Sequence, residues 1–338
     1  MVAIIGGGFI SNIHAQCYKN LGIKIEAMAD ISEKVRQEFE EKYNCKTYSS
    51  AEVMLENVSD NIDLVDICAP TFLHEEFILL ALKYNKHVIC EKPLSINIDF
   101  VENIIDKFEN NNRYLMTAQV LRFWAEYVKI KEWIEEGVFG NIKLVSAMRL
   151  AQHPKSEWFY NPKKSGGGIF ELHIHDIDFL CYLFGDVKEV YANGSKDENE
   201  SWDFINSSIK FKNGISASAQ GIFGITDNYP FTANMKVIGD KATAEYSLSA
   251  GVNLDSDGKQ SNSLILYRKG KEPIIENIKS KDAYELELEY FIDCVKNNKK
   301  PEIVSLDSIK RTIKTINCLI ESLESGNIVK FNLRSKIW

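Results

Sequence analysis

The sequence predicts an α/β protein in which a doubly wound parallel sheet is followed by an α+β domain with a mainly antiparallel sheet. Three observations support this prediction. Short apolar runs alternate with amphipathic stretches over about the first 120 residues, and a glycine run follows the first of them. From about residue 189 the sequence instead shows long alternating strands separated by turn signals. We therefore expect two domains, residues 1–120 and 121–338.

The apolar runs of the first domain indicate strands buried on both faces, because several of them are apolar almost throughout. The stretches between them carry apolar residues at helical spacing. This repetition implies parallel strands joined by right-handed crossovers. The predicted strands are Val2–Ile5, Lys24–Ala29, Leu64–Cys68, His87–Cys90 and Tyr114–Ala118, and the predicted helices are Ser32–Tyr43, Glu75–Tyr84 and Ile98–Asn110.

The second domain is predicted to place helices around a set of long strands. Asn213-Gly214 is its strongest signal, because an Asn-Gly pair between alternating strands favours a hairpin turn. Gly239-Asp240 and Lys269-Gly270 indicate further turns. The other predicted elements are the helix Trp124–Glu136, ended by Gly137, the strand Asn141–Leu150, and the helices Ala283–Lys296 and Leu306–Glu324.

Composition narrows the partners and the compartment. A formal net charge of −8 gives no electrostatic footprint for nucleic acid or an anionic membrane, although it leaves room for a local phosphate pocket. No stretch approaches the roughly 18 apolar residues that span a bilayer, and the N-terminal residues lack the regions of a signal peptide. The 7 cysteines are scattered and form no CxxC pair, so we expect reduced thiols in a cytoplasmic protein.

The glycine run predicts a dinucleotide site. Gly6-Gly7-Gly8-Phe9-Ile10-Ser11 follows a strand and opens a helix, which is the context that the dinucleotide fingerprint requires. Gly6 allows the tight turn, Gly8 lets the backbone approach a pyrophosphate, and the helix N-terminus offers N–H groups to the phosphates. Ser11 replaces the usual third Gly or Ala but is small. A plain glycine-rich turn is the alternative. The predicted cofactor contacts are Gly6, Gly8, Phe9 and Ile10.

Asp30 supports the dinucleotide interpretation. It ends the second strand about twenty residues after the loop, where an acidic side chain accepts hydrogen bonds from a ribose. Its charge would repel the 2′-phosphate of NADP, so we expect NAD to be preferred. Alternatively, Asp30 only caps the helix that follows.

Lys92 is the first candidate for chemistry. Cys90-Glu91-Lys92-Pro93 lies at the end of a predicted parallel strand, where ligands bind in doubly wound sheets. Pro93 stiffens the backbone and restricts the residue before it. Lys92 would then point to where nicotinamide and substrate meet. A solvated loop charge is the simpler alternative.

A second candidate lies in the segment Ser165–Asp178, where three glycines precede a predicted helix. Glu171 and His175 are four residues apart and would share one helix face, with Asp178 on or near it. His173, His175 and Asp176 resemble a run of metal ligands. A helix, however, places the two histidines on different faces, and no second cluster completes the coordination, so we expect no metal. Satisfied polar residues on a helix remain an alternative.

These motifs occur in an order typical of one family. The glycine fingerprint, Glu91-Lys92-Pro93, Arg122-Phe123-Trp124 and a triple-glycine helix with His175-Asp176 follow one another along the chain. In this the chain resembles the glucose–fructose oxidoreductase, inositol dehydrogenase and rhizopine-catabolism (Gfo/Idh/MocA) family of NAD(P)-dependent oxidoreductases, over essentially its whole length. The resemblance implies a Rossmann domain and a C-terminal domain whose large open sheet often forms the subunit interface, hence a homodimer or homotetramer.

The resemblance also implies roles for individual residues. Lys92 matches the catalytic lysine, and Glu91 would line the nicotinamide side. The segment Cys68–His74 would lie against the cofactor, which adds Pro70, Thr71 and His74 to the predicted cofactor contacts. Family members resembling inositol dehydrogenase carry Asp-x-x-x-His on the triple-glycine helix. His175 matches, but Glu171 is one methylene longer than the acid it replaces, and His173 replaces a small residue and would re-tune the pocket.

These residue types suit hydride transfer from a secondary alcohol. An imidazole such as His175 has a pKa suited to removing the hydroxyl proton, and Lys92 can stabilise developing negative charge on the same oxygen. Which of the two is the immediate base stays open. Glu171 would orient Lys92 or bind a neighbouring hydroxyl. Arg122 and Tyr160 are candidates for substrate binding; the alternative roles are bridging of the two domains for Arg122 and packing for Tyr160.

The expected function is an NAD(P)-dependent oxidoreductase that transfers a hydride between the nicotinamide and a secondary alcohol of a sugar, an inositol-like polyol or a glycoside. The reverse reaction, reduction of a keto sugar, stays open. One alternative is a non-catalytic dinucleotide sensor of the same fold, which would need no proton-transfer pair. The other is a metal-dependent lyase or hydrolase that uses His173, His175 and Asp176.

Overall fold

The computed structural model describes residues 1–251 and 261–331. The chain divides into two compact units: residues 1–124 with 280–310, and residues 125–279 with the chain after residue 310. The units differ from the expected domains, 1–120 and 121–338, chiefly in the segment 280–310. This segment follows the strands of the second unit along the chain but belongs to the first.

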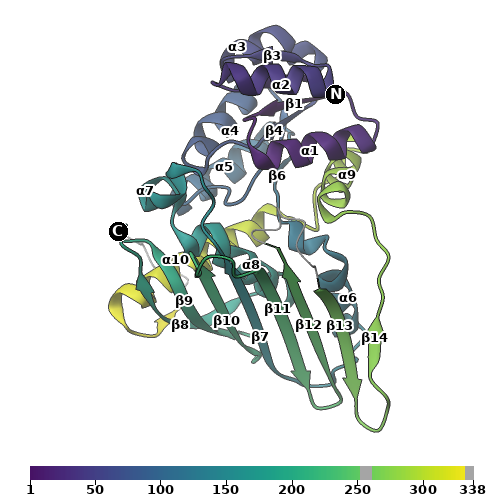
Figure 1. The fold of residues 1–338 in the computed structure, drawn as a ribbon, viewed down its shortest axis with the longest axis vertical. Helices are drawn as coiled ribbons and strands as arrows, with labels where there is room; N and C mark the ends of the chain where they lie inside the picture. The colour runs from purple at the N-terminus through teal and green to yellow at the C-terminus, as the bar shows by residue number, and fades with distance from the viewer. Residues whose placement is uncertain (252–260, 332–338) are drawn as a thin grey trace. The chain divides into compact units, whose positions relative to one another are not determined.

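The first unit contains a six-stranded, wholly parallel sheet in the order β3-β2-β1-β4-β5-β6 (Figure 1), which confirms the predicted doubly wound sheet. Its strands are β1 (Val2–Ile5), β2 (Ile25–Ala29), β3 (Lys46–Tyr48), β4 (Leu64–Ile67), β5 (His87–Cys90) and β6 (Leu115–Thr117). Its helices include α1 (Phe9–Asn20), α2 (Glu33–Tyr43), α3 (Ala51–Val58), α4 (His74–Lys83) and α5 (Ile98–Asn110), with short turns η1 (Ser59–Asn61), η2 (Thr71–Leu73) and η3 (Val120–Arg122).

The strand order reverses between β1 and β4, so a crevice for a ligand is expected beyond the carboxyl ends of these two strands. The glycine run follows β1 and therefore lies at this reversal. The strand β3 was not predicted from the sequence. Its residues Lys-Thr-Tyr are exposed or half-buried at the edge of the sheet, so no apolar run marks them.

Helix α9 (Ala283–Lys296) returns the chain to the first unit, where it packs on α1. Asp282 caps it by accepting a hydrogen bond from the backbone N–H of Tyr284 (2.9 Å). Leu288 and Phe291 are buried. Apolar spacing predicted this helix correctly, but it carries no information on which unit the apolar face covers.

The second unit is built on a nine-stranded sheet in the order β14-β13-β12-β11-β7-β10-β9-β8-β15. Only β7 and β10 pair in parallel among these neighbours in the described residues, which confirms the expected, mainly antiparallel sheet. The strands are β7 (Ile142–Ala151), β8 (Val187–Lys196), β9 (Trp202–Phe211), β10 (Ser216–Phe223), β11 (Phe231–Gly239), β12 (Ala242–Ala250), β13 (Ser261–Arg268), β14 (Ile274–Glu276) and β15 (Val329–Lys330).

The remaining helical elements flank this sheet. They are α6 (Ala125–Glu135), η4 (Glu157–Tyr160), α7 (Pro162–Ser165), η5 (Ile169–His173), α8 (Ile174–Phe184) and α10 (Leu306–Ser325). The turn at Asn213-Gly214 joins β9 to β10 as a hairpin, as predicted, with Ser216 paired to Lys210.

Helices α6, α8 and α10 cover one face of the nine-stranded sheet (Figure 1). On that face the guanidinium of Arg149 on β7 donates two hydrogen bonds, each 3.0 Å long, to the carboxylate of Asp176 on α8. Tyr127 of α6 packs edge-on against Tyr246 of β12. Buried and more exposed residues alternate along β9 and β12, as they do in a sheet with one covered face.

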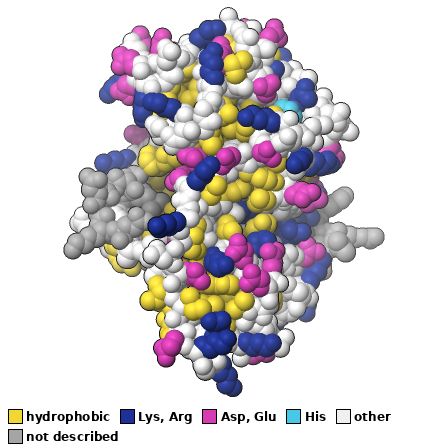
Figure 2. Space-filling view, turned by 90° about the vertical axis from the view of Figure 1, so that its right-hand side faces the viewer, with side chains coloured by type: hydrophobic (Ala, Val, Ile, Leu, Met, Phe, Trp, Pro, Cys, Tyr) yellow, Lys and Arg dark blue, Asp and Glu magenta, His cyan; other side chains and the backbone are white. Residues whose placement is uncertain are grey.

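Charges of both signs are mixed on the surface drawn in Figure 2, where lysine, arginine and acidic side chains are interspersed with apolar ones. Within the described ranges, the structure has no helix that is both long and apolar enough to cross a membrane.

Candidate functional site

The glycine loop after β1 is shaped by a neighbouring stretch of backbone. Gly6 has a φ of +96°, and a Cβ there would lie 2.6 Å from the carbonyl oxygen of Cys68, which follows β4. Glycine is the residue that tolerates both this conformation and this approach. At Gly8, in contrast, no atom from elsewhere in the described residues lies within 4 Å of the position of a Cβ. The loop is therefore tight at Gly6 and open at Gly8.

The start of α1 fits an anion. Among the described residues no side chain caps this helix, and its first turn contains no acid. Its first N–H groups and the positive end of its dipole therefore face the open part of the loop. Ser11 is fully buried and donates a hydrogen bond to the carbonyl oxygen of Gly8 (2.7 Å), so this substitution in the fingerprint is accommodated. Phe9 is 64% exposed and Ile10 is half-buried.

Asp30 joins the end of β2 to the glycine loop. Its Oδ2 accepts a hydrogen bond from the backbone N–H of Gly7 (2.8 Å), and its Oδ1 accepts one from that of Ser32 (2.8 Å). The capping residue of α2 is Ser32, whose hydroxyl accepts from the N–H of Val35 (3.4 Å). Asp30 therefore does not serve as the N-cap of α2, and its carboxylate is held beside the loop where a ribose would be bound.

The segment after β4 contains three predicted cofactor contacts, Pro70, Thr71 and His74. Thr71 and His74 are buried, and Pro70 is half-buried. His74 places Nδ1 2.8 Å from the carbonyl oxygen of Pro93 and Nε2 2.9 Å from that of Ala69. It thereby ties the segment after β4 to the segment after β5. Contact of these residues with a cofactor stays a prediction.

Glu91 and Lys92 follow β5, beyond the carboxyl ends of the parallel strands, where β1 and β4 also end. Glu91 Oε2 accepts a hydrogen bond from the backbone N–H of Lys92 (3.0 Å), and Glu91 Oε1 lies 3.3 Å from His14 Nε2. The Lys92–Pro93 peptide bond is cis. Both carboxylate oxygens of Glu91 thus have contacts inside the first unit, and its role beside the nicotinamide stays a prediction.

The triple glycine of the second unit packs directly on β9. The backbone N–H of Gly168 donates to Asp203 Oδ1 (2.9 Å), and a Cβ on Gly168 would lie 3.0 Å from the Cα of Asp203. Gly166 and Gly167 have φ angles of +84° and +76°. These glycines are therefore explained by a tight turn and a close approach to a strand, which fix the start of the following helix.

The helix that carries Glu171 and His175 does not begin as an α-helix. It opens with the π-helical turn η5 and continues as α8 from Ile174. The predicted helix is confirmed, but its first turn is wider than the α-helical spacing assumed for these two residues. Glu171 is buried and His175 is half-buried. Single π-helical turns occur frequently at functional sites.

Three other polar residues of this helix have partners in the core of the second unit. His173 is fully buried with Nε2 2.9 Å from Ser207 Oγ, and burial followed by the charge of Arg149 lowers its pKa to about 3. Asp176 is paired with Arg149, and Asp178 accepts a hydrogen bond from the hydroxyl of Thr312 (2.8 Å). His173 therefore fills the space beside β9 and β10 as a neutral core residue.

The two predicted substrate contacts differ in exposure. Arg122 is buried, and its Nη1 donates to the carbonyl oxygen of Ile303 (2.6 Å) and to Ser308 Oγ (2.8 Å), so it braces the first unit. Tyr160 is 40% exposed, and its ring centroid lies 5.0 Å from that of His153. Substrate contact stays a prediction for both residues.

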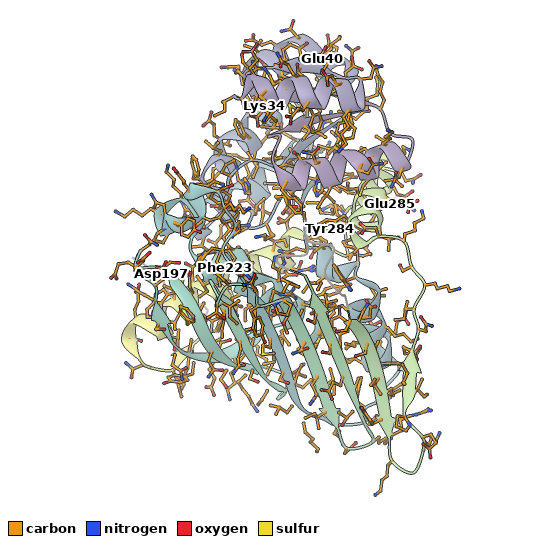
Figure 3. All side chains as sticks on the ribbon, viewed as in Figure 1. Lys34, Glu40, Asp197, Phe223, Tyr284 and Glu285 are labelled. Carbon is orange, nitrogen blue, oxygen red and sulfur yellow. The ribbon has the colours of Figure 1, made fainter. Side chains whose placement is uncertain are left out.

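Sequence reasoning missed two groups of ionisable residues. Within the described ranges, potential metal-ligand atoms come within 4.8 Å of one another in two clusters, His14–Asp66–Cys68 and His153–Asp197–Asp203, and neither includes the suggested trio of His173, His175 and Asp176. Figure 3 labels Asp197, which follows β8, and Phe223, which ends β10 beside His153.

Each cluster is explained by an ion pair. His14 Nδ1 is 2.9 Å from Asp66 Oδ2, and His153 Nε2 is 2.8 Å from Asp203 Oδ2. The first cluster had a sequence signal, since Asp66 is the one charged residue in the otherwise apolar strand Leu64–Ile67. The second had none, because its members come from three separate segments.

Comparison with known proteins agrees with this arrangement. Residues 1–119 match a family described as an oxidoreductase family with an NAD-binding Rossmann fold, and residues 127–245 match the GFO/IDH/MocA C-terminal domain. The fold and the glycine loop thus define a dinucleotide-binding oxidoreductase. More specifically, the chain belongs to the GFO/IDH/MocA family.

Individual relatives extend over most of the chain. It is 29% identical to myo-inositol 2-dehydrogenase of Thermotoga maritima over 97% of this chain and 98% of that protein. It is 28% identical to D-glucoside 3-dehydrogenase of Escherichia coli over 76% of this chain and 80% of that protein. The crystal structure of aldose–aldose oxidoreductase from Caulobacter crescentus, complexed with glycerol, superposes with a TM-score of 0.83 at 21% identity, covering 98% of this chain and 99% of that one. The last comparison supports the fold alone.

Substitution by alanine should affect stability at Gly6 and cofactor binding at Gly8. We expect Gly6→Ala to lower the free energy of unfolding by about 1–3 kcal/mol or more, because its Cβ meets a backbone carbonyl and its φ is positive. Gly8→Ala should leave stability within about 0.5 kcal/mol and weaken NADH binding, since its methyl group enters open space. Urea unfolding and NADH fluorescence titration measure the two effects. Equal destabilisation by both variants would contradict this account of the loop.

Proposed function

We propose that the protein is an NAD-dependent dehydrogenase that oxidises a secondary alcohol of a sugar, an inositol-like polyol or a glycoside. One observation carries the proposal. An open glycine loop follows β1 and Lys92 follows β5, so both lie beyond the carboxyl ends of strands of the same parallel sheet. The substrate class rests on family membership and on the relatives that are named as inositol and glucoside dehydrogenases. The opposite direction, reduction of a keto sugar, uses the same groups.

The residues of the first unit fit a bound dinucleotide. Gly8 leaves space at an uncapped helix start, and Asp30 is held by the loop N–H of Gly7, so the phosphates and a ribose each have a suitable partner. When bound, the nicotinamide supplies the acceptor for the hydride. The exposed apolar side chain of Ile31, next to Asp30 and 93% accessible, offers a surface for the adenine.

The proton is handled by the protein. In the proposed mechanism, His175 and Lys92 both serve the alcohol oxygen: one removes its proton while the other donates a hydrogen bond that stabilises negative charge. Glu171 orients these groups or binds a neighbouring hydroxyl. A base whose pKa lies near neutrality is best suited to the first task, which favours the imidazole of His175.

NAD preference follows from Asp30. Its carboxylate accepts from Gly7 and Ser32 with separate oxygens, so its negative charge is held beside the glycine loop, where it would repel the 2′-phosphate of NADP. Arg36 lies nearby, but its Nη1 donates to the backbone carbonyl oxygens of Asp30 (2.8 Å) and Ile31 (3.1 Å). Arg36 is thus held on the main chain after β2, whereas the carboxylate of Asp30 is held at the glycine loop itself.

Turnover should depend on both proton-transfer residues. Wild-type protein is screened for NAD reduction at 340 nm with inositols, hexoses, glycosides, anhydro-sugars and amino-sugars. With the substrate so found, we expect Lys92→Met and His175→Ala each to lower kcat by about 10²–10⁴-fold, while the NADH dissociation constant changes little.

Lys83→Met is the matched control, because Lys83 is an exposed lysine on α4 whose ammonium lies 3.3 Å from Glu52 Oε1 on α3. It should retain wild-type kcat. Full turnover by both Lys92→Met and His175→Ala would overturn the proposed roles. Tight NADH binding without turnover on any alcohol or keto sugar would favour the dinucleotide sensor instead.

Cofactor preference should shift when the charge of Asp30 is removed. Asp30→Asn keeps an acceptor for the N–H of Gly7 but relieves repulsion of a 2′-phosphate, so the ratio of kcat/KM for NADP to that for NAD should rise by about 10-fold or more. Glu33→Gln removes an equal charge from an exposed position three residues away and should leave the ratio unchanged. A wild-type preference for NADP would contradict the assignment.

We further propose that the face of the nine-stranded sheet opposite α6, α8 and α10 forms the interface of a homo-oligomer, a dimer or a tetramer. Five large hydrophobic side chains that are at least 38% exposed project from its strands on the side opposite the helices: Leu144, Tyr191, Phe204, Tyr267 and Ile275. Serine, threonine and asparagine side chains lie between them, so the face combines apolar anchors with polar contacts, as oligomer interfaces do.

Light scattering coupled to size exclusion tests this proposal. Phe204→Lys should shift the protein toward the monomer, because a charge would be buried in the proposed interface. Ile328→Lys is the control, since Ile328 is 61% exposed but precedes the edge strand β15. A wild-type protein that is monomeric at micromolar concentration would rule out the interface.

A further inference from the structure

The first unit holds a buried charged cluster for which the cofactor loop alone gives no reason. His14 of α1 lies at its centre, with no exposed side-chain surface. Its Nδ1 is 2.9 Å from Asp66 Oδ2 on β4, and its Nε2 is 3.3 Å from Glu91 Oε1, which follows β5. One imidazole thus bridges two carboxylates that come from neighbouring strands.

Asp66 holds one side of the imidazole in place. Its Oδ2 accepts a hydrogen bond from the hydroxyl of Tyr18 (2.8 Å) as well as from His14, and its Oδ1 accepts one from the thiol of Cys68 (3.3 Å). The Asp66 side chain is fully buried. Three groups thus converge on this carboxylate and fix its orientation, so it forms an anchor for His14.

His14 is a cation in this setting. Both of its ring nitrogens face carboxylate oxygens, an arrangement that suits the doubly protonated ring. Burial by itself lowers the pKa of His14, but the charge and hydrogen bond of Asp66, together with Cys68, outweigh this and raise the pKa well above 6.5. Nε2 lies 3.3 Å from Glu91 Oε1, which makes this contact an ion pair of the charged ring. Among the described residues, Nε2 has no aligned hydrogen bond.

The side of the cluster formed by α9 does not compete for His14. Tyr284, labelled in Figure 3, lies with its ring centroid 6.2 Å from that of His14. Glu287 on the same helix is fully buried, and burial followed by the charge of Glu91 raises its pKa well above the usual range. Glu287 Oε1 accepts a hydrogen bond from the backbone N–H of Gln119, so Glu91 is the second carboxylate whose oxygen lies against His14.

Glu91 connects the cluster to Lys92. Its side chain is 12% exposed, with Oε1 toward His14 and Oε2 accepting from the backbone N–H of Lys92 (3.0 Å). A continuous series of contacts therefore runs from Asp66 through His14 and Glu91 to the main chain of Lys92, and every link lies within the first unit.

We infer that His14 is a positioning residue for Lys92: it holds Glu91, which fixes the backbone at Lys92 and with it the direction in which the amine is presented. His14 is fully buried, so it acts through Glu91 and does not itself touch substrate. The consequence for catalysis rests on the proposed role of Lys92, whereas the mechanical link from His14 to the Lys92 backbone can be measured without any substrate.

Three variants separate positioning from general stability. His14→Asn keeps a donor near the Nδ1 position for Asp66 but removes the cation that faces Glu91. Tyr18→Phe is the matched control, because it removes another donor to the same Asp66 oxygen, and the hydrogen bond of the Tyr18 hydroxyl goes to Asp66 and not to Glu91. Glu91→Gln breaks the charge pairing from the other end, at a less buried side chain, and replaces His14→Asn if that variant fails to fold.

Hydrogen–deuterium exchange measures the link directly. In His14→Asn or Glu91→Gln, we expect the Lys92 amide to exchange about 10-fold faster or more, because its acceptor is no longer held. The neighbouring amide of Glu91, which donates to Ile67 in the sheet (2.9 Å), is the internal reference and should change little. Tyr18→Phe should leave both amides at the wild-type rate. Equal exchange at Lys92 in all variants would overturn the inference.

Kinetics give the second readout once a substrate is known. His14→Asn should lower kcat by about 10–100-fold with a smaller change in KM, and its effect should largely disappear in the Glu91→Gln background, because the two residues act in series. Tyr18→Phe should retain kcat even if its melting temperature falls. Additive losses in the double variant would mean that His14 does not act through Glu91.

These outcomes distinguish the inference from the proposed function. If Lys92→Met retains turnover while the Lys92 amide still exchanges faster in His14→Asn, the positioning link stands and the catalytic role of Lys92 fails. If Lys92→Met abolishes turnover but His14→Asn behaves as Tyr18→Phe does in both readouts, the positioning inference fails alone.

Discussion

The close passage of Gly6 under the carbonyl oxygen of Cys68 is the constraint on which the first unit depends. A Cβ on Gly6 would lie 2.6 Å from this oxygen, so the chain leaving β1 must cross the end of β4 with no side chain in between. The crossing sets where α1 begins, and α1 in turn carries Ser11 beneath the loop and His14 onto Asp66. The opening at Gly8 and the buried cluster are thus two results of one backbone contact.

The second unit uses glycine in a similar way. Gly168 presses its backbone on Asp203 at the start of β9, and its N–H is satisfied by that carboxylate. The helix that follows starts from this fixed point with a π-helical turn. In both units, then, a glycine without room for a side chain determines where a helix begins, and the candidate residues follow on that helix or on the adjoining strand ends.

Local patterns predicted what depends on local chemistry. The apolar runs located β1 and β5 to the residue, because strands buried on both faces must be apolar throughout. The Asn213-Gly214 turn and the helix Ala283–Lys296 were likewise marked by their own residues. The short edge strand β3 was missed, since three half-exposed residues bury too little to show a period.

Pairings between distant segments could not be predicted in this way. His14 and Asp66 are 52 residues apart, and only the parallel register of β1 with β4 brings α1 over the latter. The membership of 280–310 in the first unit depends similarly on which surface accepts an amphipathic helix. For the candidate site, the sequence predicted residues for cofactor binding and catalysis, while the contacts that hold that site's backbone, Asp30 with Gly7 and Gly168 with Asp203, required the fold.

The energetics of the buried cluster favour a positioning role over a stabilising one. Removing charges from water costs several kcal/mol for each ion, and well-packed apolar residues of similar volume are often as stabilising as a buried ion pair. Asp66 and His14 satisfy each other, but Glu91 then brings a second anion against the same cation, which stability alone does not require. Its other oxygen meets the backbone N–H of Lys92. Glu91, the least buried member of the cluster, is thus the side chain that connects the buried His14–Asp66 pair to the residue predicted to act on substrate, and a requirement for fixed geometry at that residue accounts for the arrangement.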